Sequence, residues 1–341
     1  MMIKPITHRK QMGLPLMVQT HAKKFVAITS LATLVMGLWV TPALARDPFR
    51  SSNARSISDQ VSAAFDSVFV NGNYPQARNY LDQADSAEPM SHAMRASLAF
   101  TSGDLATFQT NATLTRQTAE QLVSRDPLRG NLYIAVGHFL EGAYILLSDG
   151  TVRGTPRALG KLQEVFKYIK EAEKIDKNDP ELNLIKGYMD LMLAVNLPFA
   201  DVDQAIERLE RYAGPRYLAI RGIAYGYRDL GQYSKALDYI NRALKDTPNN
   251  PEVHYTKAQI LVQMAKQQNS PALYAEAAKS FKVAVQKSDQ LPRVLVWQIF
   301  FEYCLNQNTV DGQPRNCVAL RDTIDLRAGI WGPTPDNMPK L

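Results

Sequence analysis

Residues 217–250 constrain the fold of this chain more than any other stretch. They hold two runs of apolar residues at helical spacing, separated by the short break Gly231-Gln232-Tyr233 and closed by Pro248. Apolar residues that recur every three to four positions indicate amphipathic helices. Small residues stand where two helices would approach closely, and larger ones fill the spaces between them: Ala224, Ala236 and Ala243, then Ile220, Ile223, Tyr227 and Ile240. The stretch is therefore predicted to be a closely packed pair of helices.

The same order of positions recurs elsewhere in the chain. In residues 57–88, Ala77, Leu81 and Ala84 repeat the spacing of Ala236, Ile240 and Ala243. Helices are also predicted to begin at Asp179-Pro180 and Asn250-Pro251, because each pairs a capping side chain with proline at the first helical position. No alternating strand pattern competes. Residues 57–328 are therefore predicted to form roughly fourteen helices in seven pairs.

This arrangement within 34 residues resembles the tetratricopeptide repeat (TPR). The best matches are residues 58–91 and 217–250. The resemblance implies an all-α, right-handed superhelical solenoid of TPR-like helix-turn-helix pairs over residues 57–328. Residues 46–56 are then expected to be a flexible lead, residues 148–156 an irregular loop within the third pair, and residues 329–341 an irregular tail.

The N-terminus carries the features of a secretory signal peptide. Lys23-Lys24 precede the uncharged run 25–40, and Ala43-Leu44-Ala45 follows it with the small-residue pattern of a cleavage site. Residues 1–45 are therefore expected to be removed, which would leave no stable membrane span. The alternative is a protein anchored in the membrane by residues 25–40, although 16 apolar residues are slightly short for a span.

Export also bears on the charge and the cysteines. Five of the 39 basic residues lie within residues 1–45, which contain no acid, so the rest of the chain is nearly neutral. A neutral chain gives little electrostatic reason to expect nucleic acid as a partner. In an exported protein an even pair of cysteines suggests a disulfide, here Cys304–Cys317, although two buried thiols are the alternative.

No motif for catalysis or for a cofactor stands out in the sequence. There is no phosphate-binding loop, no GxSxG and no HExxH, so neither an enzymatic activity nor a cofactor is predicted. His138 and Glu141 lie three residues apart on one predicted helix and could share a metal ion, but an ordinary polar contact is the commoner meaning of such a pair. The 148–156 loop, with two glycines and Arg153, is a second weak candidate, for an anion.

The TPR resemblance implies a binding surface instead. In that family the first helix of each pair lines the concave face, and four of its positions point inward. Carried onto this chain, those positions give the predicted partner-binding groove residues Glu181, Tyr188, Arg221, Tyr225, Arg228, Glu252, Tyr255 and Gln259. Tyrosine and arginine concentrate binding energy in interfaces. The tyrosines are equally consistent with packing between helices.

The function most consistent with the resemblance is non-catalytic. We expect an exported adaptor or assembly factor, located in the periplasm or an equivalent compartment, that binds a protein or peptide segment in its groove. This expectation follows the exported bacterial-type members of the family. The alternative is an enzyme or metal-handling protein that uses the His138/Glu141 region or the 148–156 loop.

Overall fold

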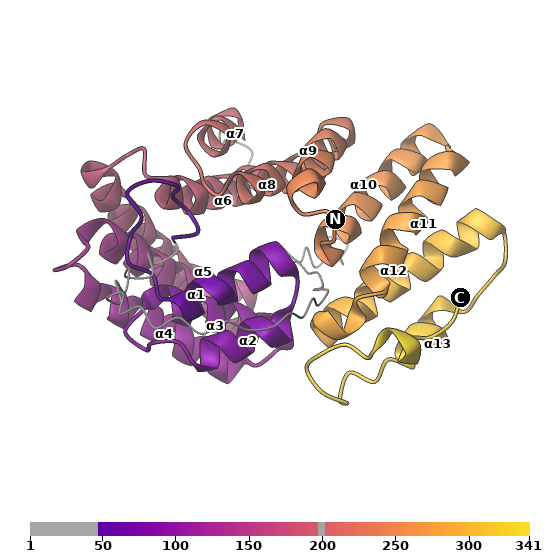
Figure 1. The fold of residues 1–341 in the computed structure, drawn as a ribbon, viewed down its shortest axis with the longest axis horizontal. Coiled ribbons are helices and arrows are strands. Elements are labelled where there is room, and N and C mark those ends of the chain that lie inside the picture. Colours follow the sequence, from indigo (N-terminus) through magenta and orange to yellow (C-terminus); the bar gives the residue numbers. More distant parts are fainter. Residues whose placement is uncertain (1–46, 197–201) are drawn as a thin grey trace, which may run out of the picture.

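The computed structural model describes residues 47–196 and 202–341, and within them the chain is all-helical (Figure 1). Consecutive helices pack against each other as pairs, as predicted. The first helix continues into a π-helical turn, Asp66–Asn71. The helices are α1 (Asp59–Phe65), α2 (Tyr74–Asp82), α3 (Pro89–Ser102), α4 (Leu105–Leu122), α5 (Pro127–Ile175), α6 (Pro180–Asn196), α7 (Val202–Arg211), α8 (Arg216–Asp229), α9 (Tyr233–Asp246), α10 (Pro251–Gln268), α11 (Pro271–Val285), α12 (Arg293–Asp311) and α13 (Cys317–Asp322).

The small residues identified in the sequence lie where helices meet. Ala224 of α8 and both Ala236 and Ala243 of α9 are fully buried, and so are the larger Ile223 and Ile240 beside them. The predicted helix starts are also confirmed. Asp179 accepts a hydrogen bond from the amide of Leu182 at 3.0 Å, and Asn250 accepts from the amides of Glu252 and Val253.

The expected irregular loop at residues 148–156 is wrong. The structure has one non-helical residue there, Gly150, with φ 76° and ψ 164°. Backbone with positive φ is readily adopted only by glycine, so a single residue is enough to turn the chain between two helices, residues 127–149 and 151–175. α5 therefore contributes both helices of the third pair.

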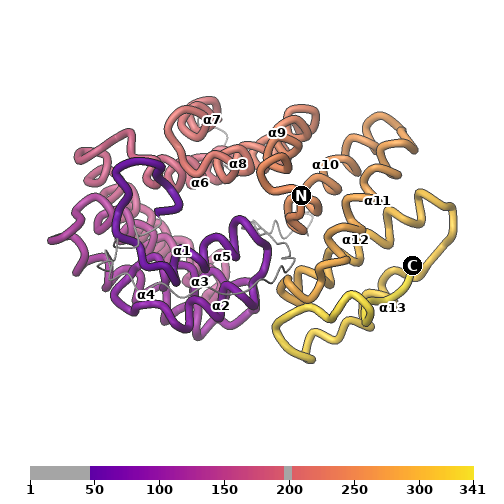
Figure 2. The backbone as a smooth tube through the Cα atoms, viewed as in Figure 1, coloured from indigo at the N-terminus to yellow at the C-terminus, as the bar shows by residue number. Residues whose placement is uncertain are grey.

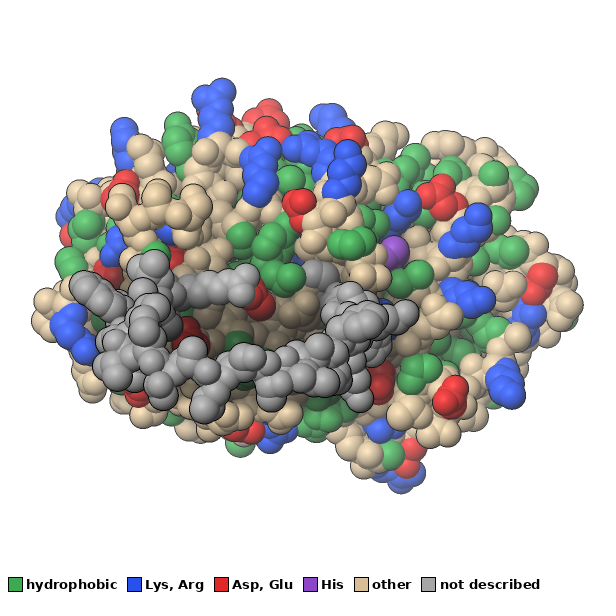
Figure 3. Space-filling model, in the orientation of Figure 1, with side chains coloured by type: hydrophobic (Ala, Val, Ile, Leu, Met, Phe, Trp, Pro, Cys, Tyr) green, Lys and Arg blue, Asp and Glu red, His purple; other side chains and the backbone are tan. Residues whose placement is uncertain are grey.

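The helix pairs follow a curve that returns on itself (Figures 1 and 2). α6, α8 and α10 lie on the inner side of this curve, while α7, α9 and α11 lie outside them (Figure 1). α12 of the last pair contacts α3 of the second pair, so the end of the array meets its beginning. The inner side is hollowed at the middle of the face seen in Figure 3, where acidic side chains are visible.

Both ends of the described chain are packed against the helices. The structure differs from the expected flexible lead, because Asp47 and Phe49 are buried. Near the C-terminus, a disulfide joins Cys304 of α12 to Cys317 of α13, with their Cα atoms 5.6 Å apart. The irregular tail beyond it is held by a hydrogen bond from the Gly332 amide to the Leu291 carbonyl at 2.8 Å.

The signal peptide predicted in residues 1–45 and the anchor considered at residues 25–40 lie outside the described residues. Within residues 47–196 and 202–341, no helix is long and apolar enough to cross a membrane.

Candidate functional site

Three acidic side chains cap the first helices of three successive pairs along the inner face. Glu88, Asp126 and Asp179 precede α3, α5 and α6, and each accepts a hydrogen bond from a backbone amide in the first turn, at 3.0 to 3.1 Å. Such caps satisfy amides that have no partner within the helix, and the helix dipole favours their negative charge. Because the three helices lie side by side, the caps gather carboxylates at one edge of the array.

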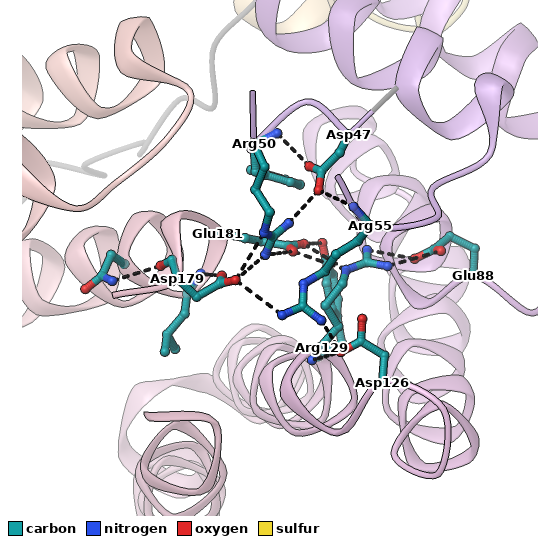
Figure 4. Close-up of polar contacts among 12 residues, drawn as sticks. Asp47, Arg50, Arg55, Glu88, Asp126, Arg129, Asp179 and Glu181 are labelled. Carbon is teal, nitrogen blue, oxygen red and sulfur yellow. Dashed lines mark hydrogen bonds and ion pairs between the residues drawn. The ribbon is translucent and has the colours of Figure 1, made fainter. Parts of the chain in front are cut away.

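Arginines from the N-terminal lead bind these carboxylates (Figure 4). Arg50 reaches Asp179 at 2.5 Å and Glu181 at 3.1 Å, and it also pairs with Asp47 within the lead at 2.8 Å. Arg55 pairs with Asp126 at 2.6 Å. The lead thus crosses the N-terminal ends of α5 and α6, which it links through charged side chains.

Arg129 of α5 completes the charged network from within the array. Its guanidinium contacts Glu181 and Glu88, each at 3.1 Å, and the hydroxyl of Tyr133 donates to Glu181 at 2.8 Å. We call Glu88, Asp126, Arg129, Asp179 and Glu181 the cradle. It holds four acids and one arginine, so the two lead arginines offset part of its excess negative charge.

The contacts at the centre of the cradle are almost inaccessible to water, while Glu88 and Asp126 at its margin are 13% and 18% exposed. The side chains of Arg129 and Glu181 are 2% and 0% exposed, and that of Arg50 is 6% exposed. Burial by itself would lower the pKa of Arg50, but Glu181 and Asp179 outweigh it and raise the pKa above its ordinary value. Buried charges are stable only when paired and hydrogen-bonded, and here each is.

The first helix pair contacts α8 and α10 on the inner face. Arg221 of α8 is fully buried and donates from Nη2 to the Phe69 carbonyl at 3.4 Å. Glu252 of α10 is buried and accepts from the Tyr74 hydroxyl at 3.1 Å. Burial raises the pKa of Glu252 to about 8, although Arg221 and the Tyr74 hydrogen bond act in the opposite direction. A neutral carboxyl group therefore suits this position near neutral pH.

The C-terminal half of the inner face carries a different kind of contact. Arg228 of α8 donates to Gln259 Oε1 of α10 at 3.0 Å, and Gln259 Nε2 donates to Glu302 of α12 at 3.1 Å. The Arg228 guanidinium also lies over the Tyr225 ring, 5.3 Å from its centre. These four side chains are only partly buried. We call Tyr225, Arg228, Gln259 and Glu302 the polar row.

The structure brings the predicted groove residues onto one inner face but divides them by environment. Tyr225, Arg228 and Gln259 belong to the partly exposed polar row. Glu181, Arg221 and Glu252 are buried and make contacts within the chain. Tyr188 and Tyr255 pack between helices, where their hydroxyls donate to the Leu218 carbonyl at 2.7 Å and to Glu302 at 2.9 Å. Whether any of the eight residues binds a partner stays a prediction.

Sequence reasoning placed Glu181 on the inner face and Asp179 at a helix start, but it missed the rest of the cradle and the α12 end of the polar row. The dipeptide Asp126-Pro127 carries the same capping signal as Asp179-Pro180, so Asp126 could also have been found. Nothing in the sequence of the lead shows that Arg50 and Arg55 would reach them, because that contact joins residues more than 70 positions apart.

The His138/Glu141 pair does not form a metal site in the described residues. His138 Nδ1 lies 3.4 Å from Glu141, whose oxygens also contact Arg116 at 3.0 Å and Lys161 at 2.5 Å. Burial would raise the pKa of Glu141, but its hydrogen bonds with His138, Lys161 and Arg116 lower it to about 2. Two cationic neighbours would repel a metal ion. No group of three His, Cys, Asp or Glu side chains within residues 47–196 and 202–341 is placed to hold one.

Comparisons with known proteins agree with the repeat architecture. Residues 215–260, which span α8, α9 and the first half of α10, match the model of the tetratricopeptide repeat. Comparison with proteins of curated function finds no match. The described fold is therefore an all-helical array of consecutively packed, TPR-like helix pairs, and arrays of this kind generally serve as binding scaffolds.

Similar solved structures include two of a human protein. The human IFIT1 dimer with PPP-AAAA has 16% sequence identity and a TM-score of 0.40, over 70% of this chain and 54% of that one. The human IFIT1 dimer with m7Gppp-AAAA has 16% identity and a TM-score of 0.43, over 74% and 59%. The matched part thus spans little more than half of the human protein.

Proposed function

We propose that this protein is a non-catalytic scaffold that binds a protein segment along the polar row, and that it acts as an exported adaptor or assembly factor. The observation that carries the proposal is the row itself. It joins the first helices of three successive pairs, α8, α10 and α12, through side chains that are hydrogen-bonded to one another yet remain partly exposed.

The chemistry of the row suits an extended polypeptide. Arg228 and Gln259 can donate to backbone carbonyls, while Gln259 and Glu302 can accept from backbone amides. Tyr225 adds an aromatic surface beside a cation, the combination that dominates many protein interfaces. A bound segment would replace hydrogen bonds that these side chains now make with one another and with solvent. Because the side chains are already held in place by those bonds, binding would require little further ordering of them.

Site-specific photo-crosslinking tests the binding surface. A photoreactive amino acid is placed at Gln259 in the full chain, and in a control protein at Lys279, which is exposed on the outer helix α11. We expect a discrete crosslinked partner from position 259 and none from position 279. Adding Arg228→Ala should weaken capture of that partner by roughly thirtyfold if Arg228 is a hot-spot residue. Identical products from both positions would refute the proposal.

Export is supported by the signal-like pattern of Lys23 to Ala45 and is consistent with the Cys304–Cys317 disulfide, because disulfides persist in oxidising compartments. N-terminal sequencing of the protein recovered from cells should begin at or near Arg46. Intact residues 1–45 on most of the protein would instead favour the anchored form.

A further inference from the structure

The lead, residues 47–56, is bound to the array in the manner of a peptide ligand. It has no helix of its own, and it contacts the array through the side chains of Phe49, Arg50 and Arg55 and through the Phe49 carbonyl. It joins α1 through two further residues only. The lead therefore shows which peptide chemistry the N-terminal half of the inner face recognises.

Phe49 gives this recognition an apolar and a steric component. Its ring is buried and meets the Phe65 ring edge-on, with the ring centres 5.1 Å apart. Its carbonyl oxygen lies so close to Gly214 that a Cβ added there would come within 2.6 Å of it. Phe49 therefore packs between Phe65 and Gly214, and we call this position the Phe65 niche. The niche lies beside the carboxylates of the cradle and does not include them.

Arg50 and Arg55 give the recognition its charge. They bind Asp179, Glu181 and Asp126, and without them the cradle would keep four acids against the single Arg129. An uncompensated buried carboxylate is strongly unfavourable. The cradle therefore requires an arginine from outside the helices, whatever chain supplies it.

We infer that the cradle and the Phe65 niche form a receptor for an aromatic–arginine segment of another protein, and that the lead occupies this receptor in cis as a competitor. A tethered segment acts at an effective concentration in the millimolar range, so an outside segment binds only when the lead is loosened or outcompeted. This inference concerns the N-terminal half of the inner face and does not depend on the polar row.

A labelled peptide with the sequence of residues 47–56 tests the receptor in trans. The full chain carrying Phe49→Ala and Arg50→Gln has a weakened lead, while wild type keeps its own. We expect the peptide to bind the variant at least about tenfold more tightly than wild type, because removal of the internal competitor raises the binding-competent fraction. Fluorescence anisotropy measures both affinities.

A control peptide with both arginines replaced by glutamine should not bind either protein. The inference is overturned if the variant keeps the helical circular dichroism of wild type but does not bind the peptide, or if both proteins bind it equally. Should the double variant fail to fold, Arg55→Gln serves instead. Arg55 is 27% exposed, so its replacement should destabilise the array less. That variant must then bind the peptide more tightly than wild type.

The source of the competing segment is tested separately by sedimentation of wild type over a range of concentrations. A monomer at all concentrations agrees with a segment from another protein. A dimer that Arg50→Gln abolishes would mean that two copies exchange their leads, and it would overturn the assignment to another protein.

Discussion

The two halves of the inner face satisfy polar side chains in opposite ways. In the N-terminal half the centre of the cradle, Arg129 and Glu181 with Arg50 of the lead, is at most 6% exposed, and the chain's own lead fills it. In the C-terminal half the polar row joins Arg228, Gln259 and Glu302 while each stays partly exposed. The inner face is thus closed at one end and open at the other.

The difference follows from what burial does to charge. A buried ion pair costs several kcal/mol when one partner is lost, because the remaining charge has neither water nor a counter-ion. A partly exposed contact costs little to break, because water replaces the missing partner. The closed half is therefore suited to holding its occupant tightly, and the open half to exchanging partners.

The largest effect that this comparison predicts is at Glu181. Glu181→Gln leaves Arg50 and Arg129 without their shared buried carboxylate and should lower the free energy of unfolding by about 5 kcal/mol, the upper end for a broken buried pair. Urea unfolding at neutral pH measures the change. A loss below about 1 kcal/mol, the range of exposed pairs, would mean that water reaches the cradle and that the two halves do not differ.

Glu252, at the junction of the halves, should show a pH-dependent effect. Its pKa of about 8 in the folded protein exceeds the ordinary value of about 4.3, so the unfolded chain loses this proton first as pH rises. The stability gained from the protonated form is complete below about pH 4.3 and is lost as pH rises through about 8. Glu252→Gln stays neutral throughout and should avoid that loss.

The unfolding free energies of wild type and Glu252→Gln, measured from pH 5 to pH 9, give the result. We expect the variant to gain on wild type with rising pH, by a few kcal/mol across this range, since one pKa unit corresponds to about 1.4 kcal/mol. A difference that does not change with pH would place Glu252 in contact with water, and the middle of the face would then belong to the open half.

The smallest effect is expected in the polar row. Arg228 is 18% exposed, and Arg228→Ala should lower the unfolding free energy by no more than about 1 kcal/mol, because water can replace its contacts. Thermal unfolding of this variant beside Glu181→Gln gives the direct contrast. If Arg228→Ala were as destabilising as Glu181→Gln, the row would be a structural element and a poor candidate for exchange with a partner.

The sequence predicted most of the fold because the relevant signals are local. Ala224, Ala236 and Ala243 indicate close contacts between neighbouring helices, whatever the curvature of the whole array. Asp179-Pro180 marks a helix start through a capping side chain and a proline that are adjacent in the sequence. The pairing of Cys304 with Cys317 needed only a short loop between them. The loop at residues 148–156 was misjudged because Gly150 alone makes the turn, while its flanking glycine, threonine and proline residues are accommodated in helix.

The environment of the inner face could not be predicted in the same way. Repeat alignment placed Glu181, Arg221 and Glu252 on this face, but their partners Arg50, Phe69 and Tyr74 come from the start of the chain. Those contacts depend on how far the whole array curves. The curvature of the array is the sum of small rotations between successive pairs, and the sequence of one repeat does not specify that sum.

The contacts between the first two and the last two pairs also have a consequence for how this molecule unfolds. An open solenoid behaves as a row of coupled units, and its terminal repeats fray because each has a neighbour on one side only. Here α12 contacts α3, and Glu252 is bonded to Tyr74 of the first pair. Each end of the array therefore packs against the other end, which takes the place of the neighbouring repeat that it lacks. Amide hydrogens in α2 and α12 should therefore exchange together and slowly, as parts of one cooperative unit.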